Sequence, residues 1–236
     1  MAKRPTPGQV KTRLAAATSD AWAARVAEAF LLDTLGRLSQ FEACRVLVFA
    51  PHGAETYFGE IVQDSFKLEP QSSGDLGERM ASFFFNAFSL GAPKVVLVGC
   101  DSPTLPLHSI EQAFTELESS QAVFGPSTDG GYYLLGCSRF IPQLFKNVPW
   151  STSQVLSSTI ANLQDSDYKV GLLPCWYDVD TLADWQMLQG HLSALRRAGV
   201  DPCLPHIERL TTVGAECYDP AFQGKEEDHE NTPTSD

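Results

Sequence analysis

Apolar and polar residues alternate along this chain in two ways, one typical of amphipathic helices and one typical of buried strands. From Ser19 or Asp20 to about Leu38, apolar residues recur every three or four positions, which predicts a helix with one buried face. Short continuous apolar runs, such as RVLVFA at 45–50 and KVVLVG at 94–99, are typical of strands that helices cover on both faces.

The same alternation continues to about residue 197. Further strands are expected near Phe66–Leu68, at AVFGP (122–126), at YYLLG (132–136) and at KVGLLPC (169–175). Further helices are expected at Glu55–Val62, after SSGDLGERM (72–80), at Leu107–Leu117, on both sides of Trp150 and at Leu182–Arg197. Because strands and helices alternate, the pattern predicts an α/β fold with a mostly parallel sheet covered on both faces.

Composition narrows the class of protein further. The 236 residues, 43% hydrophobic and 19% charged, suit one globular domain, and no segment is long and apolar enough to span a membrane.

The net charge of −12 argues against nucleic acid as a partner, because binding nucleic acid needs a broad positive surface. Six cysteines form no C-x-x-C pair, which favours reduced thiols in a cytosolic protein over a zinc site. The tail after Tyr218 is acidic and polar, so we assign the domain to residues 1–218 and expect disorder at 219–236.

Carboxylates follow three of the expected strands, at the edge where open α/β sheets bind their ligands. Asp101 and Ser102 come directly after KVVLVG, and Asp129 lies in the turn STDGG after AVFGP. Asp178 and Asp180 follow KVGLLPC. Magnesium prefers a few carboxylates together with substrate phosphate oxygens, so these residues indicate a site for a divalent ion and a diphosphate.

The first fourteen residues, MAKRPTPGQVKTRL, add a basic loop to this otherwise acidic chain. Lysine and arginine neutralise phosphate charge, and a glycine allows the backbone to approach a ligand closely. Each feature also has an ordinary structural interpretation: helix caps for the aspartates, a hairpin turn for STDGG and a solvated end for the basic loop. Their joint position at the expected ligand-binding edge favours the functional interpretation.

Six motifs in this order resemble one known family: PGQVKTRL, GDLGERM, VGCDSPTLP, GPSTDGGYYLLG, WST and DVDT, between about Lys3 and Leu195. They are similar to a bacterial glycosyltransferase-like family, the radical-SAM/selenodomain-associated transferases, which are related to 2-phospho-lactate guanylyltransferase. The resemblance implies the GT-A fold of nucleotide-diphospho-sugar transferases, which has three layers and a mostly parallel sheet.

The resemblance also implies roles for individual residues. The loop that grips the nucleotide phosphates corresponds here to Gly8, Lys11 and Arg13, and we add Ser102 to this phosphate site. The ligands of a Mg²⁺ or Mn²⁺ ion correspond to Asp101 and Asp180, with Asp178 as a further candidate. The loop near the base and ribose corresponds to Gly74, Asp75 and Arg79.

These assignments predict a cytosolic, Mg²⁺- or Mn²⁺-dependent transferase that uses a nucleotide-sugar or a nucleoside triphosphate and a small-molecule acceptor. Asp101 and Asp129 are the candidate catalytic residues. Lys11, Arg13 and the ion at Asp101 would stabilise the leaving diphosphate, and Asp129 or its neighbouring backbone would position the acceptor. Glycosyl transfer is favoured. Nucleotidyl transfer to a phosphorylated acceptor is one alternative, and a non-catalytic nucleotide-binding or scaffold protein is another, against which the presence of both Asp101 and Asp180 argues.

The start of the chain raises a separate expectation. In the family, an apolar first strand leads into the basic loop, but only Met1 and Ala2 precede Lys3. Four or five buried aliphatic side chains contribute roughly 1.5–3 kcal/mol each, against a total stability of about 5–15 kcal/mol for a domain. The first strand therefore looks missing, and we expect the assigned start to be internal, with about five to ten apolar residues before it.

Overall fold

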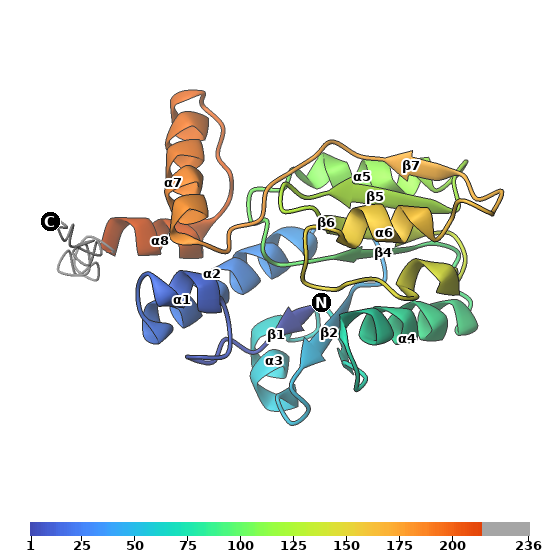
Figure 1. Ribbon diagram of the computed structural model, residues 1–236. Coiled ribbons are helices and arrows are strands. Elements are labelled where there is room, and N and C mark those ends of the chain that lie inside the picture. The colour runs from blue at the N-terminus through green and yellow to red at the C-terminus, as the bar shows by residue number, and fades with distance from the viewer. Residues whose placement is uncertain (214–236) are drawn as a thin grey trace, which may run out of the picture.

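The computed structural model describes residues 1–213, which form two sheets with helices around them (Figure 1). Sheet A is parallel, in the order β1 (Ala2–Lys3), β2 (Val46–Ala50), β3 (Lys67–Pro70). Sheet B has the order β4 (Val95–Val98), β6 (Tyr132–Cys137), β5 (Ala122–Pro126), β7 (Val170–Leu172). Strands β2 to β7 thus lie at the positions that the apolar runs predict, with ends that differ by up to three residues, and the α/β class is confirmed.

Strand β1 connects the two sheets although it has only two residues. It pairs with the end of β2, while the Met1 amino group donates to the carbonyl of Val98 in β4 at 2.9 Å. Buried Gln71 supports this junction, because its Nε2 donates to the carbonyls of Ala2 (3.1 Å) and Val48 (3.2 Å). Two residues therefore stand in the place of the first strand, and the expected extension before Met1 stays a prediction.

Sheet B is mixed, whereas sheet A is parallel, so most strand pairs of the fold are parallel, as predicted. Strand β6 is antiparallel to both β4 and β5, whereas β7 is parallel to β5. The reason is the turn at 127–131, which is far shorter than the dozen or so residues that a parallel crossover needs. Gly130 makes this turn possible: its φ is +90°, and a Cβ there would lie 2.2 Å from the carbonyl oxygen of Ser153.

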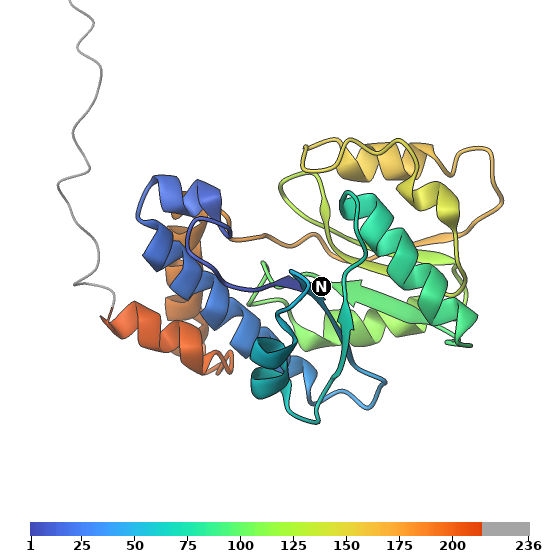
Figure 2. The same ribbon diagram turned by 90° about the horizontal axis from the view of Figure 1, so that it is seen from below.

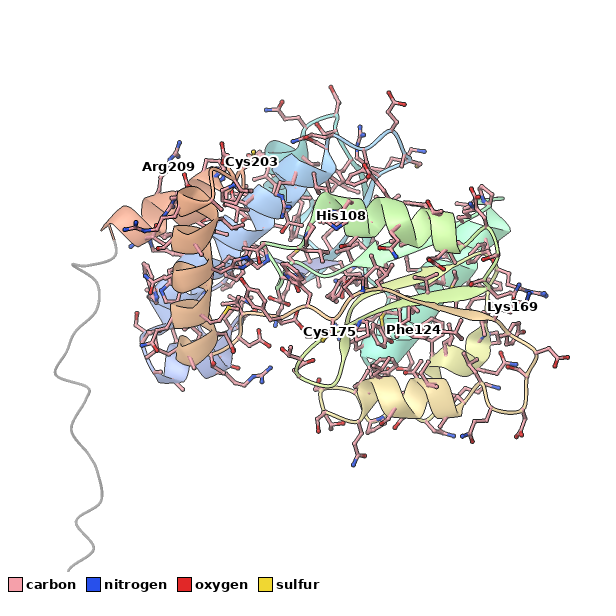
Figure 3. The ribbon with its side chains drawn as sticks, turned by 90° about the horizontal axis from the view of Figure 1, so that it is seen from above. His108, Phe124, Lys169, Cys175, Cys203 and Arg209 are labelled. Carbon is pink, nitrogen blue, oxygen red and sulfur yellow. The ribbon has the colours of Figure 1, made fainter. Side chains whose placement is uncertain are left out.

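Helices cover both faces of sheet B, as the continuous apolar strands predict. One face is covered by α5 (Leu107–Glu116), and the other by α4 (Leu76–Ser89), the short helix η1 (Pro142–Phe145) and α6 (Val155–Ala161). Along β5, Val123 packs into the core beneath α5, while Ala122 and Phe124 pack into the opposite core. Figure 3 shows Phe124 on the strand between α5 and α6.

Helix α2 (Asp20–Leu38) belongs to two cores. Its Leu31 and Leu35 pack against sheet A and α3 (Glu55–Val62), and its Val26 and Phe30 pack into a group of helices. That group consists of α1 (Thr12–Ala16), α2, α7 (Leu182–Arg197) and α8 (Pro205–Val213). It lies at one end of the molecule, and the segment after β7 runs across to it (Figure 2).

Helix α1, of five residues, and helix α8, of nine, were not among the predicted elements. Among residues 1–213, no helix combines the length and the hydrophobicity needed to cross a bilayer. The five cysteines of this range are free thiols. The tail predicted to be disordered, 219–236, lies outside the described residues.

Candidate functional site

The ammonium group of Lys11 lies at the centre of the predicted site. It donates hydrogen bonds to Oδ1 of Asp101, to Oδ1 of Asp180 at 3.2 Å and to the carbonyl of Val179 at 2.7 Å. These three acceptors match the three donors of an ammonium group. The Lys11 side chain is only 4% exposed, and its Nζ lies 5.0 Å from the centre of the Phe30 ring, at cation–π distance.

Two cations and two carboxylates balance each other in this cluster. Burial lowers the pKa of Lys11, but the charges of Asp101 and Asp180 outweigh burial and hold that pKa above its ordinary value, so the amine is charged. Nη2 of Arg13 donates to Oδ2 of Asp180 at 2.6 Å. The side chains of Arg13 and Asp101 are 64% and 56% exposed, so the cluster opens to solvent on their side.

The loop before α1 turns Lys11 towards the aspartates through two left-handed residues. Gly8 has φ +75°, and a Cβ there would lie 3.3 Å from Oδ2 of Asp20, so the loop needs glycine at this position. Lys11 itself has φ 46° and is the residue from which α1 starts. On the other side, the N–H of Val179 donates to the carbonyl of Asp101 at 2.8 Å and ties the segment after β7 to the end of β4.

Asp178 lies beside this cluster and joins the ends of three strands. Its Oδ1 accepts a hydrogen bond from Oγ of Ser102, after β4, and its Oδ2 accepts one from Oγ of Ser127, after β5, at 2.6 Å. Burial raises the pKa of Asp178, the two serine hydrogen bonds lower it, and the charges of Asp101 and Asp129 raise it again; the net shift is upward. Both oxygens therefore already have partners, and Asp178 orders the strand ends.

Asp129 stabilises the hairpin turn in which it lies, as is typical of an aspartate followed by two glycines. Its Oδ1 accepts from the N–H of Gly131 at 2.8 Å, which closes the turn of the β5–β6 hairpin. The hairpin interpretation of STDGG is thus confirmed. Asp129 still lies close enough to Asp178 for its charge to act on that carboxyl group.

The predicted base and ribose residues form the start of α4. Asp75 and Glu78 make a reciprocal capping box, with both hydrogen bonds at 2.9 Å, and Nε of Arg79 donates to the carbonyl of Gly74 at 2.8 Å. Gly74 has φ +107°, and a Cβ there would overlap the Glu78 side chain. Within residues 1–213 no hydrogen bond or ion pair joins this loop to the Lys11 cluster, so its contact with a nucleotide stays a prediction.

A second polar network beside Asp178 was missed by the sequence reasoning. Nε1 of Trp176 donates to Oγ1 of Thr104 (3.3 Å), which donates to the hydroxyl of Tyr177 (2.9 Å), and that hydroxyl lies 2.7 Å from Nδ1 of His191. The network links the segments after β4 and β7 to α7. Cys175, labelled in Figure 3, precedes Trp176, whose backbone still bonds to Pro126 and Thr128 beside β5. The aromatic pair before DVDT was the available signal, whereas nothing near His191 in the sequence indicates its role.

The resemblance implies a Mg²⁺ or Mn²⁺ ion, and the residues assigned to it can be tested against the geometry. Asp101 and Asp180 do meet, but the Lys11 ammonium lies between them. In the part of the chain that the structure describes, no group of three His, Cys, Asp or Glu side chains is arranged to hold a metal ion. In this state of the protein, the residues therefore do not fit a resident metal ion.

The fold is shared with proteins of known structure. A crystal structure of a "putative nucleotide-diphospho-sugar transferase" from Desulfovibrio desulfuricans G20 is similar with a TM-score of 0.81 and 30% identity, over 91% of this chain and 94% of that one. A cytidylyltransferase from Leptospira borgpetersenii serovar Hardjo-bovis shares the fold alone, with a TM-score of 0.52 and 13% identity over 92% and 94% of the two chains.

The class is therefore that of the nucleotide-diphospho-sugar transferase fold, as the resemblance implied. More particularly, the chain belongs to the family described as "Uncharacterized protein conserved in bacteria (DUF2064)", whose model matches residues 31–152. That range contains Asp101 and Asp129 but neither the basic loop nor Asp180. Among the curated proteins, none matches this chain.

Proposed function

We propose that this protein is a transferase that acts on a nucleotide-sugar or a nucleoside triphosphate and a small-molecule acceptor. One observation carries the proposal: the basic loop and the aspartates after β4 and β7, far apart in sequence, meet at the strand ends where open α/β sheets bind ligands. Lys11 and Arg13 bind the outer phosphates and stabilise the charge that develops on the leaving group. Asp129 positions the acceptor, while Gly74, Asp75, Arg79 and Ser102 contact the nucleotide.

Glycosyl transfer is the favoured reaction, supported by the motifs shared with the radical-SAM/selenodomain-associated transferases. Nucleotidyl transfer is the second candidate, and the state of Asp178 favours it. Both oxygens of this carboxylate accept serine hydrogen bonds, which leaves it poorly placed to take a proton from an acceptor hydroxyl. A phosphorylated acceptor is already a nucleophile and requires no such base. Products separate the two reactions, because only nucleotidyl transfer releases pyrophosphate from a nucleoside triphosphate.

Nucleotide binding by Lys11→Ala and Arg13→Ala tests the proposed roles. Both changes should weaken binding of di- and triphosphates more than binding of monophosphates, because both side chains are assigned to the outer phosphates. Calorimetric titration of the wild type and each variant with one nucleoside in its three phosphorylation states gives the comparison. A ligand at about 100 times its dissociation constant should also stabilise the wild type by roughly 2.7 kcal/mol.

Lys94→Ala is the matched control, because Lys94 lies before β4, at the strand end away from Asp101, and donates to the carbonyl of Phe114 at 3.0 Å. It should bind all nucleotides as the wild type does. An equal loss for mono-, di- and triphosphates would remove Lys11 and Arg13 from the phosphate site. Absence of any nucleotide binding across the four bases would contradict the proposed function. The cytosolic location stays a prediction, consistent with the free thiols.

A further inference from the structure

The Lys11 ammonium occupies the position that a cation shared by Asp101 and Asp180 would need. It contacts Oδ1 of both carboxylates and the carbonyl of Val179. A Mg²⁺ ion binds oxygen ligands at about 2.0–2.1 Å, so an ion held by the same two oxygens would overlap the ammonium group or face it at close range. Steric exclusion and like-charge repulsion therefore act together against the ion.

The charges of the free site also act against binding of a divalent ion. Lys11 pairs with both Asp101 and Asp180, and Arg13 pairs with Asp180, so each of these carboxylates already has a cationic partner that a dication would have to displace. A bound phosphate chain changes both the position of the ammonium group and the charge of the site. Its oxygens accept hydrogen bonds, so Lys11 can turn from the carboxylates to the phosphates. Its negative charge attracts a divalent ion, which phosphate sites hold with one or two carboxylates plus phosphate oxygens.

We propose that Lys11 excludes divalent cations from the free protein and releases Asp101 and Asp180 only when phosphate groups bind. The order of binding then follows: phosphate and ion bind together, and neither carboxylate holds an ion beforehand. The exposed guanidinium of Arg13, at the solvent side of the cluster, offers the first contact for the incoming phosphate. This inference rests on the proposed phosphate site, but it requires no particular base, sugar or acceptor.

Equilibrium dialysis with Mn²⁺ as the probe tests the exclusion. Free wild-type protein should retain no Mn²⁺ at concentrations where Lys11→Met retains about one ion per chain, a difference in affinity of at least about tenfold. Lys94→Met, which removes a lysine charge before β4, should behave as the wild type. Adding Asp101→Asn to Lys11→Met should abolish the gained binding, which would locate the ion.

A second experiment uses only the wild-type protein. It remains decisive if the Lys11→Met variant fails to fold, which a thermal unfolding measurement of that variant would reveal. Wild-type protein should retain Mn²⁺ when inorganic pyrophosphate is present and not when it is absent. Retention of Mn²⁺ by the free wild type as tight as by Lys11→Met, or unchanged by pyrophosphate, would overturn the proposal. Because pyrophosphate carries no nucleoside, failure to find a cognate nucleotide would count against the proposed function and not against this inference.

Discussion

Asp178 shows how a single half-buried carboxylate alters the pH dependence of stability. The pKa of an ordinary aspartate is about 3.9, and burial together with the neighbouring charges raises that of Asp178 above this value in the folded protein. A carboxyl group whose folded pKa exceeds its unfolded pKa favours folding only while it is protonated. That contribution is present below the unfolded pKa and is lost as pH rises through the folded pKa.

Asp178→Asn should therefore be more stable than the wild type at pH 7, and the difference should shrink as pH falls towards 4. The amide removes the charge yet keeps one acceptor and adds donors for the hydroxyls of Ser102 and Ser127. Urea unfolding at both pH values gives the comparison, with Asp64→Asn as an exposed control. A variant that is less stable at pH 7, or a difference independent of pH, would show that the hydrogen bonds outweigh burial.

At the scale of elements, Asp33 attaches α8 to α2. This side chain, buried on α2, accepts the backbone N–H groups of His206 (3.1 Å) and Ile207 (2.9 Å), and it lies 2.7 Å from Nδ1 of His206. The first N–H groups of a helix have no partner within the helix. Asp33 supplies partners to two of them across 173 and 174 residues of sequence.

Asp33→Ala should lower the free energy of unfolding by about 2–3 kcal/mol, because it leaves two donors near the core without partners. Asp33→Asn, which keeps an acceptor oxygen, should lose less. Urea unfolding measures both, and hydrogen exchange should show faster exchange in α8 than in α5. The exposed Asp64→Ala should change stability by no more than about 0.5 kcal/mol. A similarly small effect of Asp33→Ala would mean that apolar packing alone holds α8.

At the scale of the whole molecule, one core connects the two sheets. Phe84 of α4 is fully buried in a cluster that contains Val48 of sheet A and Phe124 of sheet B. Strand β1 contributes little area to this junction, since it has only two residues. The packing of α4 therefore makes sheets A and B one cooperative unit, which residues of α2 and the helical group extend.

Phe84→Ala should cost about 3–5 kcal/mol, whereas Phe85→Ala, at the next position and 54% exposed, should cost no more than about 1 kcal/mol. In both variants, tryptophan fluorescence and far-ultraviolet circular dichroism should follow a single coincident unfolding transition. Trp22 and Trp185 lie in the helical group and Trp150 packs beside α4, so the total tryptophan fluorescence reports on both ends of the molecule. Separate transitions would show that this group unfolds independently.

Much of the fold and part of the candidate site could be predicted because they depend on local chemistry. The apolar periods located α2, α4 and α7, and the runs around 46–50 and 95–98 located buried strands. Positions at strand ends placed the aspartates at one edge, the family resemblance assigned Lys11 to the same site, and the structure joins them. Helices α1 and α8 were not predicted, whereas the β5–β6 hairpin was one of the two interpretations of STDGG. The pairing of β6 with β4 was beyond this reasoning, because it depends on contacts between segments that lie far apart in the sequence.

The sequence by itself determined the position of most helices and strands and which aspartates stand at strand ends. Only the tertiary structure decided that the Lys11 ammonium lies between Asp101 and Asp180, above the ring of Phe30, instead of leaving the carboxylates to a metal ion. The physical reason is distance along the chain. Periodicity and capping act over a few residues, whereas this charge cluster joins residues 90 and 169 positions apart, which only the packing of both sheets against the helices brings within hydrogen-bonding range.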